Sequence, residues 1–341
     1  MRIVVTGSVA VDHLSHFPGL FSEQLVAGHL DHVSLSFLLE RLDIHYGGVA
    51  ANISAGLGRL GHRPVLVGAV GSDFAGYRAW LEREGVDTGS VLVRADLYTA
   101  RFWGTTDQRQ NQIATFYPGA MSAARDISLA GVTGRVGADV LVLVGANDPA
   151  AMIRHTEECR TLGLPFAADP SQQLAALDPD AIRSLIGGAR YLFTNEYEHA
   201  LLLTKTGWTE DDVLAAVGTW VTTLGEAGAR IDAAGEPAVL VPDVPVTDIV
   251  DPTGAGDGFR AGFLAARDRG LSLVTAARLA ALVATVVLEA EGSAEYQLDG
   301  PAMLTRLAGA YGDAAAGELR SWLAGISAAD PTRQAITVMD L

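Results

Sequence analysis

Short apolar runs alternate along the chain with longer segments in which apolar residues recur every three to four positions. The apolar runs are typical of buried strands and span residues 3–7, 65–70, 140–145, 165–169, 191–195 and 221–224. The helical spacing covers residues 50–60, 74–84, 149–162, 180–187 and 196–205. This alternation predicts an α/β fold with a mainly parallel central sheet and helices on both faces, and the pattern becomes mostly helical after residue 241.

Two early segments, residues 13–46 and 97–117, interrupt this alternation. The second contains two alternating stretches around a polar turn at 107–110, which predicts a β-hairpin. We expect both insertions to form a small β lid; a hairpin that only decorates the sheet edge is the alternative. The predicted units are a large domain of residues 1–12, 47–96 and 118–328, a lid of residues 13–46 and 97–117, and a loose tail of residues 329–341.

Composition narrows the classes of partner and compartment. The formal net charge of −16 disfavours nucleic acid and anionic membrane as partners. Cys159 is the only cysteine, so no intramolecular disulfide can form. The first residues read as a strand rather than a signal peptide, and the apolar stretch 271–290 reads as a core helix. We therefore expect a cytoplasmic protein.

The segment from Asp251 to Phe263 carries the strongest chemical signal. Its glycines, Gly254 and Gly256, allow a sharp turn just before an apolar helix. The first free amides of that helix would form an anion hole at Gly254, Ala255 and Gly256. Asp257 lies in the same turn, where its carboxylate could accept the proton of an attacking hydroxyl. The alternative is a carboxylate that only caps the helix.

Other phosphoryl-transfer motifs are missing from the sequence. Lys205 is the only lysine, and it belongs to neither a Walker A loop nor a protein-kinase signature. Phosphoryl chemistry would therefore depend on backbone amides, arginine and metal.

Four motifs, taken together, resemble the ribokinase (PfkB-type) family of sugar and nucleoside kinases. They are Asp251–Phe263, the run Gly-Gly-Val-Ala-Ala-Asn at 47–52, Asn-Glu-Tyr-Glu at 195–198 and Thr-Leu-Gly-Glu-Ala-Gly at 223–228. In this family the aspartate of the first motif is the catalytic base, which corresponds to Asp257. The resemblance implies a ribokinase-like fold and Mg²⁺ bound as Mg-ATP, and it leaves a monovalent cation open as a further cofactor.

The same resemblance implies roles for the residues of the shorter motifs. Gly48 would approach the substrate and Asn52 would bind its hydroxyls. Asn195 would contact ATP, and Glu198 would hold Mg²⁺ through water, although helix capping explains both equally well. The nucleotide loop would be formed by Thr223, Gly225 and Gly228.

Further stretches make the chain look like an actinobacterial-type adenosine kinase. They include Ser-Leu-Ser-Phe at 34–37, Arg-Phe at 101–102, residues 114–121, residues 145–149 and residues 168–173. In that family, aromatic rings of the lid sandwich the purine. The substrate residues implied are Ser8, Asp12, Ser36, Phe102, Phe116, Gln172 and Gln173. Asp12 would bind the vicinal hydroxyls of the sugar. The two phenylalanines, on opposite arms of the predicted hairpin, could face one another and stack on a base; packing within the lid is the alternative for these rings.

The expected function is therefore an adenosine kinase of purine salvage. It would transfer the γ-phosphate of ATP to the 5′-hydroxyl of adenosine and act as a homodimer formed through the lid. A kinase of ribose, fructose or another nucleoside is one alternative. A non-catalytic nucleotide or sugar sensor on the same fold is another.

Overall fold

The computed structural model describes residues 1–24 and 35–327 and is built around an eight-stranded sheet. The strand order is β14 (Val239–Val241), β13 (Ala229–Asp232), β12 (Trp220–Thr223), β11 (Tyr191–Asn195), β10 (Phe166–Ala168), β9 (Val140–Val144), β1 (Arg2–Thr6) and β4 (Val65–Val67). All neighbours from β12 to β4 pair in parallel, and antiparallel pairing occurs only at one edge, between β12 and β13 and between β13 and β14. The predicted mainly parallel sheet is therefore confirmed.

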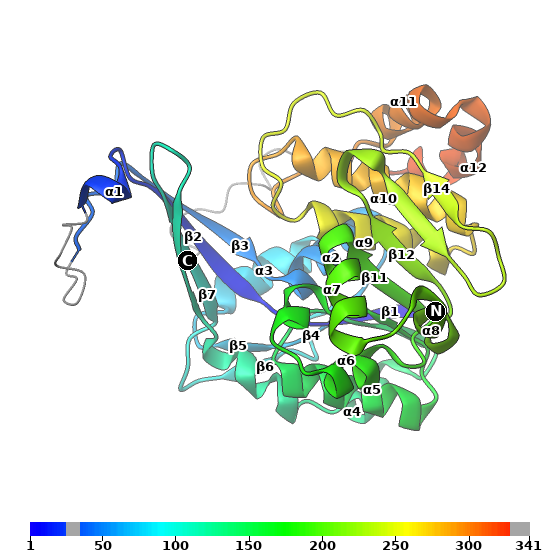
Figure 1. Ribbon diagram of the computed structural model, residues 1–341, viewed down its shortest axis with the longest axis horizontal. Coiled ribbons are helices and arrows are strands. Elements are labelled where there is room, and N and C mark those ends of the chain that lie inside the picture. The colour runs from blue at the N-terminus through cyan, green and yellow to red at the C-terminus, as the bar shows by residue number, and fades with distance from the viewer. Residues whose placement is uncertain (25–34, 328–341) are drawn as a thin grey trace.

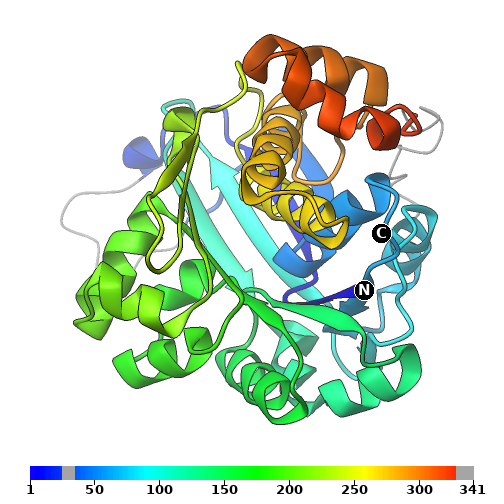
Figure 2. The same ribbon diagram turned by 90° about the vertical axis from the view of Figure 1, so that its right-hand side faces the viewer.

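Helices cover both faces of this sheet (Figures 1 and 2). One face carries α2 (Val49–Arg59), α3 (Ala75–Arg83), α9 (Ala255–Asp268), α10 (Leu273–Leu288), α11 (Gly300–Tyr311) and α12 (Asp313–Leu323). The other carries α4 (Leu129–Val136), α5 (Pro149–Leu162), α6 (Pro179–Ile186), α7 (Glu196–Thr206) and α8 (Glu210–Ala216). Ile3 and Val5 of β1 enter the first core and Val4 the second, so the strand is apolar on both sides.

A second sheet of four strands, here called the lid sheet, extends from one end of the molecule (Figure 1). Its order is β3 (Arg41–Gly47), β2 (Ala10–His16), β7 (Ala100–Thr106) and β8 (Gln112–Tyr117), with the short helix α1 (Phe21–Gln24) near its tip. The antiparallel pairing of β7 with β8 confirms the hairpin expected within 97–117. Residues 25–34 of the predicted lid and the predicted tail 329–341 lie outside the described residues, and the domain boundaries stay predictions.

Two parts of the sheet region differ from the sequence pattern. The apolar run 65–70 is divided between β4 and β5 (Ala69–Gly71), and β5 pairs with β6 (Leu92–Arg94) instead of joining the large sheet. The division falls at Gly68, where a Cβ atom would lie 2.9 Å from the carbonyl oxygen of Gly7. The antiparallel strands β13 and β14 were not predicted; β13 carries the charged residues Arg230 and Asp232, and β14 is only three residues long.

The apolar stretch 271–290 forms α10, a 16-residue helix buried in the core. This confirms the prediction of a core helix. Within the described residues, no helix has both the length and the hydropathy needed to cross a membrane.

Candidate active site

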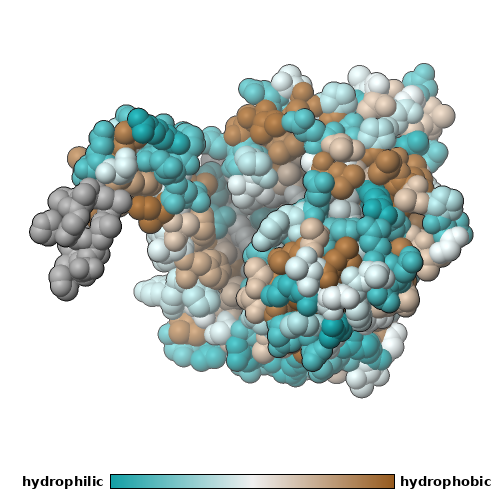
Figure 3. Space-filling view, in the orientation of Figure 1, coloured by the Kyte–Doolittle hydropathy of each residue, from teal (hydrophilic) through white to brown (hydrophobic). Residues whose placement is uncertain are grey.

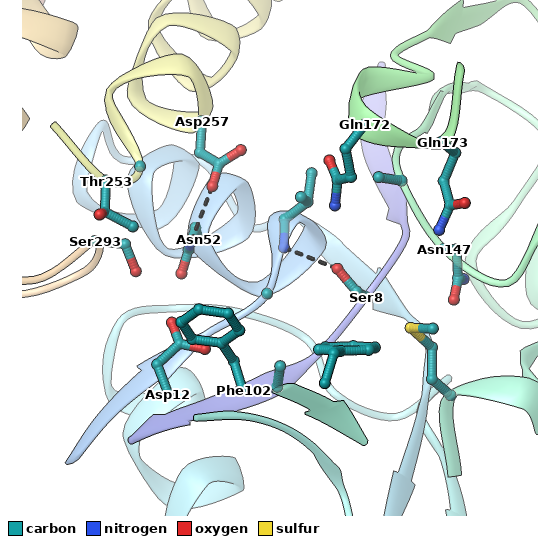
Figure 4. A pocket seen from close by; sticks show the side chains of 17 residues that line it. Ser8, Asp12, Asn52, Phe102, Asn147, Gln172, Gln173, Thr253, Asp257 and Ser293 are labelled. Atoms are coloured by element: carbon teal, nitrogen blue, oxygen red, sulfur yellow. Dashed lines mark hydrogen bonds between the residues drawn. The ribbon is translucent and has the colours of Figure 1, made fainter. Parts of the chain in front are cut away.

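A cavity of about 410 Å³ opens where the lid sheet meets the carboxyl ends of the parallel strands (Figures 3 and 4). Parallel α/β sheets bind their ligands at this edge. The lining residues are Ser8, Ala10, Asp12, Gly48, Val49, Asn52, Phe102, Phe116, Met121, Ala146, Asn147, Gln172, Gln173, Thr253, Gly254, Asp257 and Ser293. The structure thus brings together every residue predicted to bind substrate except Ser36, which is exposed and is not among the lining residues.

Two glycines, Gly47 and Gly48, precede α2 on one side of the cavity. Gly48 has a φ of 98°, and a Cβ atom there would lie 2.7 Å from the backbone of Ser8 and Val9. Only glycine permits both the positive φ and this close approach. The hydroxyl oxygen of Ser8 accepts a hydrogen bond from the Val49 amide at 3.1 Å (Figure 4). These contacts fix the start of α2, and with it the buried side chain of Asn52.

Asp257 extends from the first turn of α9 into this cavity. Its Oδ2 accepts a hydrogen bond of 2.9 Å from Nδ2 of Asn52 (Figure 4). In the described structure the carboxylate bonds to the neighbouring helix rather than to an amide of its own, so capping does not account for it. Burial raises the pKa of Asp257 to about 7, partly offset by Asn52 and by the charge of Arg260. A carboxylate with this pKa is suited to accept a proton near neutral pH.

The N-terminus of α9 presents amides without helical partners. The first intrahelical bond runs from the Gly258 amide to the Gly254 carbonyl at 2.9 Å, so the amides of Gly256 and Asp257 precede it. The Ala255 amide makes only a 3.4 Å bond to the carbonyl of Pro252. A helix N-terminus with free amides binds anions, and its dipole favours negative charge there. The turn can therefore hold a phosphate group next to Asp257.

A second cavity, of about 290 Å³, lies on the other side of this turn. Its lining is mostly apolar and consists of Thr223, Gly225, Glu226, Gly228, Asp243, Val246, Ile249, Pro252, Ala255, Gly256, Phe259, Ala281, Ala284 and Leu288. It includes all three predicted residues of the nucleotide loop. Gly254 and Asp257 line the first cavity, whereas Ala255 and Gly256 line the second. The amides of α9 thus lie at the boundary between two binding cavities.

Asn195 and Glu198 line neither cavity. They form a capping box in which Asn195 Oδ1 accepts from the Glu198 amide at 2.7 Å and Glu198 Oε2 accepts from the Asn195 amide at 2.8 Å. Burial raises the pKa of Glu198, and Arg260 lowers it. Across residues 1–24 and 35–327, no group of three or more His, Cys, Asp or Glu side chains could hold a metal ion. A Mg²⁺ ion here would therefore need the phosphates and water as its main ligands.

Asp12 approaches the cavity from the lid sheet. The glycine at position 47 leaves room for its carboxylate, which a Cβ atom there would overlap. Burial raises the pKa of Asp12 to about 6, opposed by His45, its neighbour on β3. The Nδ1 atom of His45 in turn lies 2.8 Å from Oε1 of Glu295. A carboxylate so placed can accept hydrogen bonds from two adjacent hydroxyl groups.

Phe102 and Phe116 lie directly opposite each other in the β7–β8 ladder. Residues paired in this way share one face of a sheet, and both rings line the cavity. The two rings are thus neighbours on one face of the lid sheet, and their stacking on a base stays a prediction.

Two lining residues, Asn147 and Ser293, were not predicted. Asn147 is 2 % exposed and Ser293 is 3 % exposed, yet Asn147 Nδ2 and Ser293 Oγ have no hydrogen-bond partner in the described structure, as is also true of Asn52 Oδ1. Buried polar atoms without partners are costly, which indicates a polar ligand. The signal for Asn147 was available, because it follows β9 at the ligand-binding edge of the sheet.

Residues 6–299 match the model of the pfkB family of carbohydrate kinases. The chain belongs to this family. It is 34% identical over 271 residues to a nucleoside kinase of Methanothermobacter thermautotrophicus, covering 78% of this chain and 86% of that protein. A nucleoside kinase of Burkholderia thailandensis in complex with inosine superimposes with a TM-score of 0.80 at 33% identity, covering 91% of this chain and 98% of the other.

A third comparison extends the likeness in fold. A nucleoside kinase of Methanocaldococcus jannaschii superimposes with a TM-score of 0.77 at 24% identity, covering 90% of this chain and 98% of the other. The predicted ribokinase-like fold and the predicted family are both confirmed. The protein is therefore a kinase, and its two cavities are candidate sites for the two substrates.

Proposed function

We propose that this kinase is an adenosine kinase that transfers the γ-phosphate of Mg-ATP to the 5′-hydroxyl of adenosine. The observation that carries the proposal is the position of Asp257, in the acceptor cavity and in the same helical turn as the amides that border the nucleotide cavity. Adenosine would occupy the cavity beneath the lid sheet. ATP would occupy the cavity beside Gly225 and Gly228, with its phosphates directed to α9.

The reaction follows from these positions. The 5′-hydroxyl gives its proton to the carboxylate of Asp257 as its oxygen forms a bond to the γ-phosphorus. The bond from that phosphorus to the bridging oxygen of ADP breaks, which gives AMP and ADP. The amides of Ala255 and Gly256 stabilise charge on the transferred group. Asn52 orients the carboxylate, and Asp12 binds the ribose hydroxyls.

Magnesium would enter with ATP. Hard Mg²⁺ prefers oxygen ligands and retains several waters. Glu198, with Asn195 beside it, is the acid that we propose to hold the water shell of the ion, in agreement with its buried carboxylate and with the lack of a larger acidic cluster in the described residues. The ion would neutralise charge on the phosphates as the group transfers.

The preference for a nucleoside over a free sugar is supported by the apolar face of the acceptor cavity. Phe102, Phe116 and Met121 offer a surface for a base, which a free sugar does not need. Related kinases named for nucleosides agree with this assignment. The test is a phosphorylation assay with adenosine, inosine, other nucleosides, ribose and fructose. Faster turnover of ribose or fructose than of every nucleoside would reject the proposal and favour the sugar-kinase alternative.

Removing the ring of Phe102 should weaken nucleoside binding. Stacking contributes roughly 1–3 kcal/mol per base, so Phe102→Ala should raise the KM for adenosine by about 5- to 150-fold and leave the KM for ATP nearly unchanged. Steady-state rates with either substrate varied measure both constants. Trp103→Ala is the matched control, because this ring lies next in β7 and does not line the cavity. An unchanged adenosine KM in Phe102→Ala would remove the ring from the substrate site.

We also propose that the lid sheet joins two copies of the chain. Along β8 every residue is exposed, including Ile113 at 43 %, and such an uncovered edge strand favours pairing with another strand. Sedimentation velocity at micromolar concentration should give the mass of a dimer, and Ile113→Arg should shift it towards the monomer. Leu240→Arg, on exposed β14 at the far sheet edge, is the control. A monomer at all concentrations would contradict the proposal.

A further inference from the structure

A buried ion pair joins the catalytic helix to the opposite wall of the acceptor cavity. Arg260 of α9 donates from Nε to Asp169 Oδ2 at 2.9 Å and from Nη2 to Asp169 Oδ1 at 2.8 Å. The two residues are only 5 % and 1 % exposed, although 91 positions separate them in the chain. Two parallel hydrogen bonds to a planar guanidinium fix both the distance and the angle between the segments.

The third contact of Arg260 is made with the anion-hole turn itself. Its Nη1 donates to the carbonyl of Gly256 at 3.1 Å. A Cβ atom at position 256 would lie 2.9 Å from this nitrogen, so a glycine makes room for the guanidinium. The side chain therefore supports the peptide whose amide lies in the first turn of α9.

Asp169 is fixed from the other side by the large sheet. Its amide donates to the carbonyl of Val144 at 2.9 Å, directly beyond β10. The chain then passes through Ser171, whose φ of 49° is unusual for a residue other than glycine, before Gln172 and Gln173 reach the cavity. Such backbone conformations are costly and persist where the surroundings determine them. The ion pair thus fixes the position of the anion-hole turn relative to the segment that carries Gln172 and Gln173.

Arg260 is also a cation that acts on several acids of the site. Its charge lowers the pKa of Asp257 and of Glu198, whereas Asp169 raises both. On its remaining side the guanidinium lies 5.7 Å from the ring centroid of Phe193 in β11. Arg260 lines neither cavity, because these contacts hold its side chain within the protein. It acts through its neighbours.

We propose that Arg260, held by Asp169, is a positioning residue that sets the amides of Ala255 and Gly256 at the place where the transferred phosphate develops charge. The inference rests on the proposed roles of Asp257 and the amides of α9. An error of about 1 Å in such a site can lower the rate by about a hundredfold. The pair is thus part of the catalytic geometry and not only a contribution to stability.

The test replaces the pair by apolar residues of similar size, in Arg260→Met/Asp169→Leu. Exchange of a buried ion pair for apolar groups is often neutral or stabilising, so this variant should remain folded where a single change leaves a charge unpaired. Circular dichroism and the melting temperature check the fold. We expect kcat to fall by about tenfold or more, whereas the KM values for both substrates change by less than about threefold.

Two single variants complete the experiment. Arg260→Lys keeps the charge but not the paired hydrogen bonds, so it should also lower kcat. Arg135→Gln alters an arginine that pairs with Asp87 at the opposite end of the sheet, and should leave kcat within about twofold. Rates are measured with whichever nucleoside or sugar the unmodified enzyme phosphorylates fastest, so that a wrong substrate assignment leaves the test intact. A folded double variant with full kcat would overturn the role of Arg260.

Discussion

Replacing Asp257 by asparagine should lower kcat by roughly 10²-fold or more, the usual scale for a general base. The change keeps the size of the side chain and leaves an oxygen that can accept from Asn52, whose Nδ2 lies 2.9 Å from the carboxylate. It removes only the ability to take a proton. Adenosine binding, measured by isothermal titration calorimetry, should therefore change little. A kcat close to that of the unmodified enzyme would reject Asp257 as the base.

Two further readouts separate a base from a structural acid. Activity of the unmodified enzyme should fall as the pH drops through about 7, because the protonated acid cannot act as a base, and the residual activity of Asp257→Asn should lack this step. The pKa is raised above the ordinary value of an aspartic acid, so the ionised carboxylate lowers folding stability above about pH 7 but not below about pH 4. Asp257→Asn should therefore melt no lower than the unmodified enzyme at pH 8. Asp268→Asn, at the far end of α9, is the matched control for kcat.

The large sheet could be predicted because its central strands are buried on both faces. Residues such as Ile3, Val4 and Val5 leave an unbroken apolar run, which periodicity detects. The last two strands give a weaker signal, because β13 includes two charged residues and β14 spans only three positions. At Gly68 the chain leaves the large sheet at the end of β4 and enters β5. The backbone of Gly7 lies close to Gly68 at this point, and this contact between distant residues cannot be read from the local sequence.

The site, too, contains residues that local motifs predict and residues that only the fold brings together. Asp257, Gly48 and the nucleotide loop belong to short motifs whose glycines have a local physical reason, and the structure places them at two adjoining cavities. The pair of Arg260 and Asp169 has no such motif, because its partners meet only after the sheet has formed. Neither residue could be paired with the other from spacing alone.

The lid could be predicted only in part from the sequence. Alternation predicted the strands of Phe102 and Phe116 correctly, whereas the register that pairs the two residues on one face is known only from the structure. Register depends on the length of the connecting turn, which the polar residues at 107–110 do not fix. Ser36 was assigned through the family resemblance alone, and its exposed position carries no independent support for a contact with substrate.

The second large effect is expected from Gly254→Ala, which changes the turn that forms the anion hole. Gly254 has a φ of 81°, and a Cβ atom there would lie 2.7 Å from the Cβ of Ser293 and 2.9 Å from its Cα and its carbonyl oxygen. Backbone atoms cannot rotate away as a flexible side chain could. The first turn of α9 must therefore move, and a displacement of about 1 Å at the transferred phosphate should lower kcat by about a hundredfold.

Alanine at Gly254 would have two effects, a steric clash and the strain of a positive φ. A second glycine serves as a control that has the positive φ without the clash. Gly207 ends α7 with a φ of 68° and has no atom within 4 Å of the position of a Cβ. Gly207→Ala should lower the melting temperature, because alanine at positive φ is strained, but it should keep full kcat. Gly254→Ala should lose both stability and turnover. If the two variants kept the same kcat at a temperature where both are folded, the amides at the start of α9 would not be the groups that stabilise the transferred phosphate.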